Sequence, residues 1–184
     1  PADSHGPPLD GALVAFQLYL QLQAPIKVLV PYAKELAEAM KKMASALDSH
    51  AIELKAEEKA VYHASAVIAS NYLVTLVKMA TDLWETMGIS KEEATRALLP
   101  LIKGTINNIE TIGLPGCLTG PIARGDGGTV KKHLESLEKI TPELVPAYIE
   151  LARQTIPVAL AKGKINERQT EALKSVLDNE LSRV

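Results

Sequence analysis

The feature that most constrains this chain is a helical pattern from about Glu57 to Met87, which contains neither proline nor glycine and has no charged residue between Lys59 and Lys78. Gly88 stands where a glycine would end the helix. At 1.5 Å per residue, such a helix would be on the order of 45 Å long, which is unusual in a globular domain. A helix so long and so sparsely polar is not expected to exist alone. The sequence therefore predicts that it packs against its own copy in a homodimer, burying well over ~2,000 Å² in total.

Helical signals continue after this segment. Ser90, with Glu93 three residues later, forms a capping box, and the helix that follows is expected to contain Pro100 and to end near Gly113. A glycine-rich connection at 114–128 comes next. Three further helices are expected at about 129–140, 141–162 and from Asn166 to the C-terminus, the last capped by Asn166 and Gln169. The sequence therefore predicts a mainly α-helical fold with a long central helix.

The first 55 residues have a different pattern. Residues 16–23 alternate between apolar and polar side chains, which is typical of a strand, and residues 26–30 form a short apolar run. A helical period begins at Pro31 and lasts to Leu47, and the segment 51–55 (AIELK) alternates again. These signals predict a small β-α-β unit. Two domains follow from this: a β-α-β segment at 1–55 and a helical domain at 56–184.

Composition excludes several classes of function. The formal net charge is −2, which argues against a nucleic-acid footprint. The single cysteine, Cys117, suits a reducing, cytoplasmic environment and excludes an intrachain disulfide. The four histidines lack metal-ligand spacing, so no metal is expected. The uncharged run 11–26 contains three glutamines and Pro25, so no membrane partner is expected there.

The first candidate site lies near the start of the long helix, in a polar cluster. Lys59 and His63 are four residues apart and therefore share a face, where they could bind an anion or protonate a substrate carbonyl or imine. The alternative is a half-buried core histidine beside a solvated lysine. In the same way, Asn71 could contact a neighbouring helix instead of a substrate. The full cluster is Lys59, Tyr62, His63, Ser70 and Asn71.

The second candidate site is the loop 118–129, LTGPIARGDGGT. Its glycines let backbone N–H groups converge, Arg124 adds a planar set of donors, and the following helix offers its positive N-terminus. These features are typical of an anion or carboxylate site. The alternative is a structural turn, in which Asp126 or Thr129 caps the helix and the glycines adopt positive φ. Cys117 precedes the loop, where a buried small apolar residue is favoured over a nucleophile because no base is placed beside it.

Three segments together resemble a known family: KAVYHASAVIASNYLVTL (59–76), LLPLIKGTINNI (98–109) and LTGPIARGDGGTVKKHLESL (118–137). They are similar to the C-terminal helical domain, itself of unknown function, of Rossmann-like NAD(P)-dependent oxidoreductases. That domain is related in fold to the C-terminal domains of 6-phosphogluconate dehydrogenase, pyrroline-5-carboxylate reductase and the coenzyme F420-dependent NADP oxidoreductases. The resemblance covers about 58–162 of this chain.

The resemblance implies a helical domain that dimerises and binds a small-molecule substrate, beside a Rossmann domain that holds NADP or NAD. In related hydroxyacid dehydrogenases the long helix carries a lysine and, four residues later, an asparagine. Here His63 stands at the second position. Lys59 and His63 are then implied as catalytic residues, and a larger set is implied in substrate binding: Tyr62, Ser70, Asn71, Thr119, Arg124 and Asp126.

One departure from the family is large, because the sequence contains no GxGxxG fingerprint. Only the last β-α-β of a Rossmann domain would fit before residue 56, so the chain is expected to hold NADP poorly and to be inactive alone. The open alternative is a non-catalytic helical module for dimerisation or ligand binding, without cofactor. Hydrolysis by Cys117 with His63 is a third and weaker hypothesis.

Overall fold

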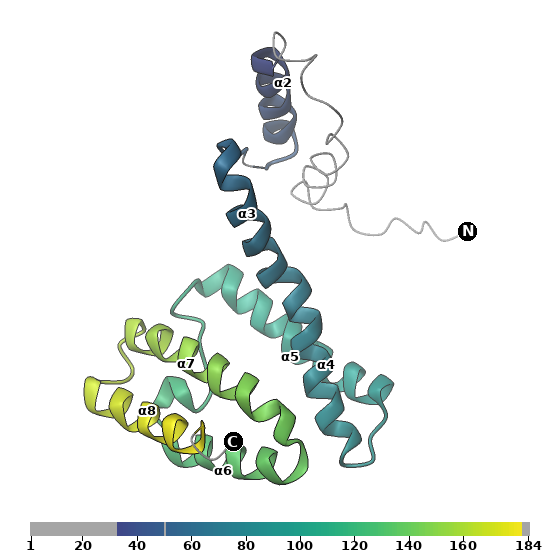
Figure 1. Ribbon diagram of the computed structural model, residues 1–184. Coiled ribbons are helices and arrows are strands. Elements are labelled where there is room, and N and C mark those ends of the chain that lie inside the picture. Colours follow the sequence, from purple (N-terminus) through teal and green to yellow (C-terminus); the bar gives the residue numbers. More distant parts are fainter. Residues whose placement is uncertain (1–32, 50, 182–184) are drawn as a thin grey trace. The chain divides into compact units, whose positions relative to one another are not determined.

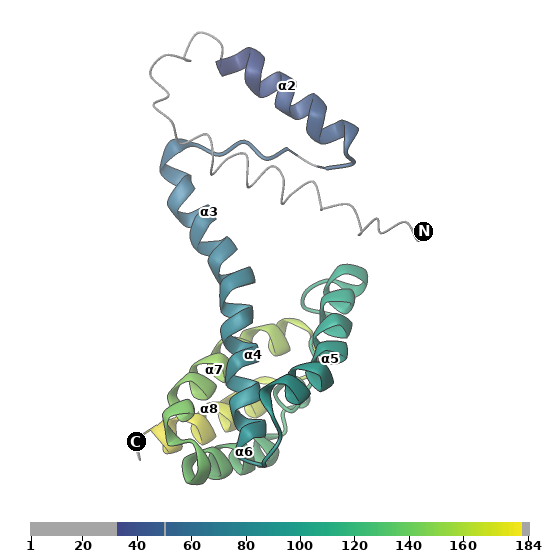
Figure 2. The same ribbon diagram turned by 90° about the vertical axis from the view of Figure 1, so that its right-hand side faces the viewer.

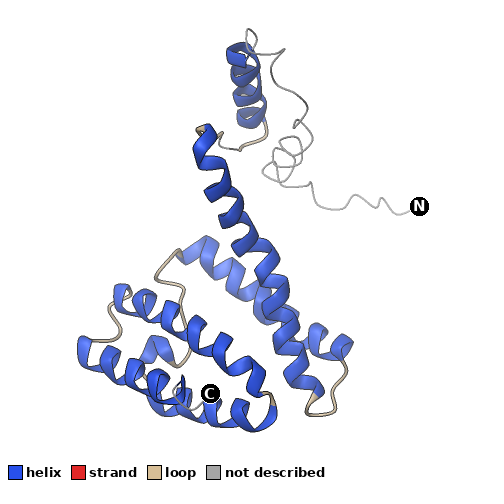
Figure 3. Cartoon of the chain, viewed as in Figure 1, coloured by secondary structure: helices blue, strands red, loops and turns tan. Residues whose placement is uncertain are grey.

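A computed structural model describes residues 33–49 and 51–181, and within this part every regular element is a helix (Figures 1 and 3). The prediction of a mainly helical chain is confirmed. The chain divides into two compact units, one running to Ala64 and the other beginning at Ser65.

In the first unit, α2 spans Ala33–Ala46, which confirms the helix expected after Pro31. Lys41 on α2 pairs with Glu38, at 3.1 Å, and with Glu53. The hydrogen bond to Glu53 raises the pKa of Lys41, and the same contact lowers the pKa of the Glu53 carboxyl. The segment that follows α2 is therefore tied to this helix by a charged side chain.

The prediction of a strand at 51–55 is wrong, because this segment is neither strand nor helix. A strand forms only when its backbone N–H and C=O groups pair with a neighbouring strand, and alternation over five residues does not supply that partner. The other expected strands, 16–23 and 26–30, lie outside the described residues. The β-α-β unit is therefore not supported.

The expected long helix is present as an unbroken helical run, Ala56–Glu85. It consists of a 3₁₀ turn η3 (Ala56–Glu58), α3 (Lys59–Ala66), a π-helical turn η4 (Val67–Asn71) and α4 (Tyr72–Glu85). Gly88 follows in the left-handed region, with φ +81°, as expected of the residue that ends it. By length and composition alone, this run is the one helix in the described part that is long and apolar enough to cross a membrane.

In the second unit, α4 is followed by α5 (Lys91–Ile112), and the two form a helical hairpin (Figure 2). The Ser90 Oγ atom accepts a hydrogen bond from the Glu93 backbone N–H at 3.2 Å, which confirms the predicted cap. The helix continues through Pro100 to Ile112, and Gly113 follows with φ +76°.

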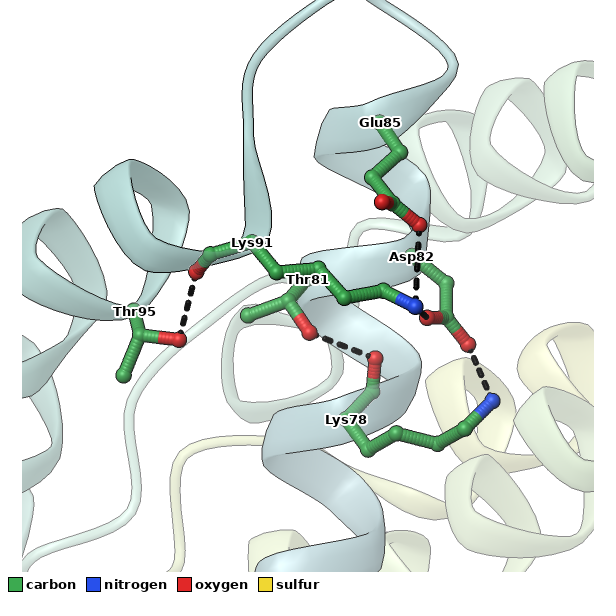
Figure 4. Close-up of polar contacts among 6 residues, drawn as sticks. All are labelled: Lys78, Thr81, Asp82, Glu85, Lys91 and Thr95. Carbon is green, nitrogen blue, oxygen red and sulfur yellow. Dashed lines mark hydrogen bonds and ion pairs between the residues drawn. The ribbon is translucent and has the colours of Figure 1, made fainter.

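Charged side chains close the turn of this hairpin (Figure 4). Asp82 accepts from Lys78 on its own helix and lies 3.3 Å from the Lys91 Nζ atom at the start of α5. Lys91 also lies 3.1 Å from Glu85. Two hydroxyl groups bond back to their own helices, Thr81 to the Lys78 carbonyl at 2.8 Å and Thr95 to the Lys91 carbonyl at 2.6 Å.

The remaining helices are packed together as a bundle: α6 (Gly127–Ile140), α7 (Val145–Ala161) and α8 (Glu167–Leu181), with the short turns η5 (Ile122–Arg124) and η6 (Pro142–Leu144) (Figure 1). Their boundaries match the sequence expectations to within a few residues. The hydrophobic core of the unit lies between them, and its largest fully buried side chains are aliphatic: Leu134, Ile149, Leu173, Leu177, Val130 and Val145. At the start of α8, the Asn166 side chain accepts from the Gln169 N–H at 2.9 Å and the Gln169 side chain accepts from the Asn166 N–H at 3.1 Å. This is the reciprocal cap that the sequence predicted.

Candidate functional site

The residues predicted for the first site are divided between the two units. Lys59, Tyr62 and His63 lie on α3 in the first unit, and Ser70 and Asn71 lie in the second. Lys59 is half-buried, whereas His63 is exposed. The alternative of a half-buried core histidine therefore does not describe His63.

Ser70 and Asn71 lie in the π-helical turn η4, and both are exposed. The bond that defines this turn runs from the Tyr72 backbone N–H to the carbonyl of Val67, five residues earlier. The extra residue shifts every later side chain by about 100° relative to a regular α-helix. A face that is extended from Lys59 and His63 at 100° per residue therefore does not continue beyond Ala66. No sequence signal revealed the π turn, although such turns occur often at functional sites.

The glycine-rich loop is held firmly against the bundle. Ile122 and Ala123 of η5 are buried, and the Lys162 Nζ atom at the end of α7 donates to the Leu118 carbonyl oxygen at 2.7 Å. Gly125 has φ +68°, and a Cβ atom built there would lie 2.5 Å from the side-chain nitrogen of Gln169. The left-handed backbone conformation favours glycine at this position, and an added Cβ atom would force the Gln169 side chain to shift.

Asp126 is the N-cap of α6. Its Oδ1 atom accepts from the Thr129 N–H at 3.0 Å and its Oδ2 atom from the Thr129 hydroxyl at 2.6 Å. These hydrogen bonds lower the pKa of the Asp126 carboxyl, and the charges of Arg124 and Lys132 lower it further. Asp126 and Gly125 therefore have the conformation expected of a structural turn that caps a helix, which was the alternative to an anion site. A carboxylate at this helix N-terminus also opposes the binding of an external anion there.

Arg124 and Thr119 are the predicted loop residues with exposed side chains. Arg124 ends η5 directly after the two buried residues of that turn, so its backbone is fixed while its guanidinium group reaches solvent. Arg124 forms no ion pair with any described residue. Cys117 is half-buried and is a free thiol.

Three residues that contribute to this region were not singled out as site residues from sequence. Lys162 and Gln169 were treated only as helix-end residues, and their contacts with Leu118 and Gly125 span more than forty residues of chain. The third is His133 of α6. It is exposed, but its Nδ1 atom lies 2.8 Å from the Tyr148 hydroxyl and the two rings meet edge to face. Among the described residues, no group of three potential metal ligands comes together.

The described part of the chain therefore defines a mainly helical protein, in which a long helix precedes a compact bundle with a rigid glycine loop. A family model described as "Domain of unknown function (DUF2520)" matches residues 27–155, and the chain belongs to this family. No curated protein matches the chain, and neither does any solved structure.

Proposed function

We propose that this chain is the substrate-binding and dimerisation domain of an NAD(P)-dependent oxidoreductase that acts on a small anionic substrate. The resemblance of residues 59–76, 98–109 and 118–137 to the C-terminal domains of such enzymes supports the proposal, including a bundle of the 6-phosphogluconate dehydrogenase type. In the structure, residues 59–76 and 98–109 are helical, and residues 118–137 contain η5 and most of α6.

The observation that carries the substrate part of the proposal is the setting of Arg124. A guanidinium group binds a carboxylate or phosphate through two parallel hydrogen bonds, and it does so best when little freedom is lost on binding. The buried residues Ile122 and Ala123 fix the backbone before Arg124, and Gln169 packs over Gly125 after it. The nearby Asp126 carboxylate is already bonded to Thr129. Arg124 is therefore an exposed cation on a fixed backbone, and its guanidinium group is accessible to an anionic ligand.

The other predicted residues have supporting roles in this proposal. Lys59 and His63 would position the substrate or exchange a proton with it, since both side chains carry N–H groups that can donate to a substrate oxygen. Tyr62, Ser70, Asn71 and Thr119 would supply hydrogen bonds.

The nicotinamide dinucleotide does not fit the residues described here. Its pyrophosphate binds where a strand, a glycine turn and a helix follow one another, and the described residues contain no strand. The glycines at 125–128 lie at the start of α6, but the N-terminus of this helix is capped by Asp126. We therefore derive no reaction step through the dinucleotide, and the proposal assigns its binding to other residues.

Titration with inorganic phosphate and with succinate, followed by amide NMR shifts and calorimetry, tests this function. We expect saturable shifts around 119–126 in the native chain and a loss of affinity of at least about tenfold in Arg124→Ala, since one charged hydrogen-bonding partner contributes about 1.5–3 kcal/mol. Arg96→Ala, which removes an exposed arginine of α5, is the matched control and should bind normally. Equal binding by both variants, or no binding by the native chain, would exclude the anionic-substrate role.

A second candidate function is a non-catalytic module for dimerisation or ligand binding. One observation favours it: the polar groups of the glycine loop bond within the protein, as in the contacts of Asp126 with Thr129 and of Lys162 with Leu118. The two functions differ at Lys59 and His63. If the chain is an oxidoreductase domain, Lys59→Ala and His63→Ala should each weaken succinate binding. If it is a non-catalytic module, neither substitution should change the affinity for succinate.

A further inference from the structure

One lysine of the bundle continues the buried face of α7. The buried residues of this helix recur every three or four positions: Val145, Ile149, Ala152, Ile156 and Ala159. Lys162 follows Ala159 by three residues with helical backbone angles, so it lies on the same face. Lysine is rarely found on a core-facing stripe, and its long stem carries the charge to the edge of the core when it is. Apolar packing alone therefore does not explain this residue.

The ammonium group of Lys162 is held at the start of the glycine loop. Its Nζ atom donates to the Leu118 carbonyl oxygen at 2.7 Å, and the side chain is half-buried. An ammonium group has three donors, and this hydrogen bond engages one of them. Lys162 forms no ion pair with any residue in the described part of the chain. A charge that is partly withdrawn from water is stabilised by an opposite charge, so this position favours an anion.

Arg124 is placed at the other end of the same segment, six residues after Leu118. The backbone between the two cations is fixed, because the N–H groups of Arg124 and Asp126 both donate to the Pro121 carbonyl oxygen, at 3.1 and 2.9 Å. The turn η5 also packs against α7, the helix that carries Lys162. The two cations are therefore anchored at separate points of one rigid loop.

We propose that Lys162 is a second cation of the anion site at Arg124, and that the site selects a dicarboxylate over a monocarboxylate. This inference rests on the proposed function, which assigns an anionic ligand to Arg124, and it names the class of that ligand. A guanidinium group binds one carboxylate through two parallel hydrogen bonds, and an ammonium group attracts a second carboxylate as a point charge. Cations anchored at separate points suit two carboxylates that are separated by a short carbon chain.

The charges around the loop favour a ligand with two negative charges. Asp126 is the acidic residue of the loop 118–129, and its carboxylate already accepts two hydrogen bonds from Thr129. These hydrogen bonds lower the pKa of that carboxyl most, and the nearby charges of Arg124 and Lys132 lower it further. With Lys162, three cations act on a loop that carries one carboxylate. Because the Coulomb energy grows with the product of the charges, a dianion gains more from this excess than a monoanion does.

A purely structural role for Lys162 makes a different prediction. A cation at the C-terminal end of α7 interacts favourably with the helix dipole, and its bond to Leu118 ties the loop to the bundle. If that were its whole role, loss of the side chain would disturb the site for every ligand to the same extent. A second cation of the site acts only on the second carboxylate. The ratio of the two affinities therefore separates the roles.

Titration of the full chain with succinate and with acetate, followed by amide NMR shifts, tests this inference. We expect the native chain to bind succinate at least about tenfold more tightly than acetate, since the second carboxylate gains a charged hydrogen-bonding partner. Lys162→Met should lose this preference while its affinity for acetate stays unchanged, and Lys162→Arg should keep most of it. Lys164→Met, which removes an exposed lysine two positions later, is the matched control and should keep the preference in full.

Four outcomes would overturn the inference. An equal loss of affinity for both acids in Lys162→Met would leave Lys162 a structural role, with the proposed function intact. Succinate binding that depends on Arg124 but not on Lys162 would have the same meaning. A native chain that binds neither acid would remove the proposed anionic site as well. Inorganic phosphate that binds more tightly than succinate, and depends on both cations, would assign the site to a phosphate group in place of a dicarboxylate.

Discussion

The α6–α8 bundle and the α4–α5 hairpin are built from similar amphipathic helices within one compact unit, yet they bury their apolar side chains very differently. In the bundle, Leu134, Ile149, Leu173 and Leu177 are almost completely inaccessible to solvent. In the helices of the hairpin, the buried residues are Thr81 and Ala94, and both are small. The bundle therefore covers its own apolar side chains, whereas the hairpin leaves large apolar side chains such as Val74 and Leu101 exposed. The difference shows that helices with buried apolar faces and helices with exposed apolar faces can follow each other along one chain.

The largest expected effect comes from removing a core side chain of the bundle. Leu173→Ala should lower the free energy of unfolding by about 3 kcal/mol, because it removes buried methyl groups and leaves a cavity. Denaturant unfolding at low protein concentration measures this. Leu101→Ala in the hairpin is the comparison and should cost under about 0.5 kcal/mol in the monomer, since Leu101 is exposed there. Equal losses of stability in the two variants would mean that Leu101 also lies in a buried core. The difference in burial between the bundle and the hairpin would then not hold.

Two glycines should respond in opposite directions. Gly125→Ala in the bundle should destabilise the protein by about 1–2 kcal/mol, since φ is +68° and the new methyl group would meet Gln169. Gly104→Ala in α5 should stabilise it by up to about 1 kcal/mol, because it lies in a helix interior with nothing near the added Cβ atom. Thermal unfolding of the two variants checks the pair. A stable Gly125→Ala variant would show that the loop is not fixed.

The contact between Tyr148 and His133 should contribute less. Burial raises the pKa of the Tyr148 hydroxyl, and this hydroxyl shares a hydrogen bond with the His133 Nδ1 atom. Tyr148→Phe removes this hydrogen bond while keeping the ring, and should cost about 0.5–1 kcal/mol because His133 is exposed. Urea unfolding gives the value, and the double variant with His133→Ala separates the hydrogen bond from ring packing. In a protein that already carries His133→Ala, Tyr148→Phe should cause no further loss of stability, because the hydrogen-bonding partner of the hydroxyl group is already absent.

The smallest predicted effect concerns two aspartates, one in each region. Hydrogen bonds lower the pKa of both carboxyls, from Lys78 and Lys91 for Asp82 and from Thr129 for Asp126. A lowered pKa in the folded state adds stability above the unfolded value near 3.9, and this stability is lost as pH falls through the folded value. Salt screens the lysines but not the threonine, so about 1 M NaCl should raise the pKa of Asp82 more than that of Asp126. NMR titration of the carboxyl carbons measures both, and equal shifts would contradict this explanation.

The sequence predicted the helices well because their signals are local. The capping pairs Ser90–Glu93 and Asn166–Gln169, and the glycines Gly88 and Gly113, each act within one helical turn. Leu173 and Leu177 are four residues apart, on one face of α8, and both are buried. The local pattern was less informative at 51–55, because an alternating segment becomes a strand only when a second strand pairs with it.

The candidate sites depended more on tertiary structure. The residue types of the glycine loop indicated either an anion site or a turn, and only the contacts of Lys162, Gln169 and Thr129 decided which atoms were already engaged. The π turn that contains Ser70 and Asn71 changes the face of the helix on which each later residue lies, and no sequence signal indicated this turn. The sequence by itself thus determined where helices begin and end, because caps and periodicity are short-range. Only the tertiary structure decided which apolar stripes are covered and which polar groups remain available, because these depend on contacts between residues far apart in the chain.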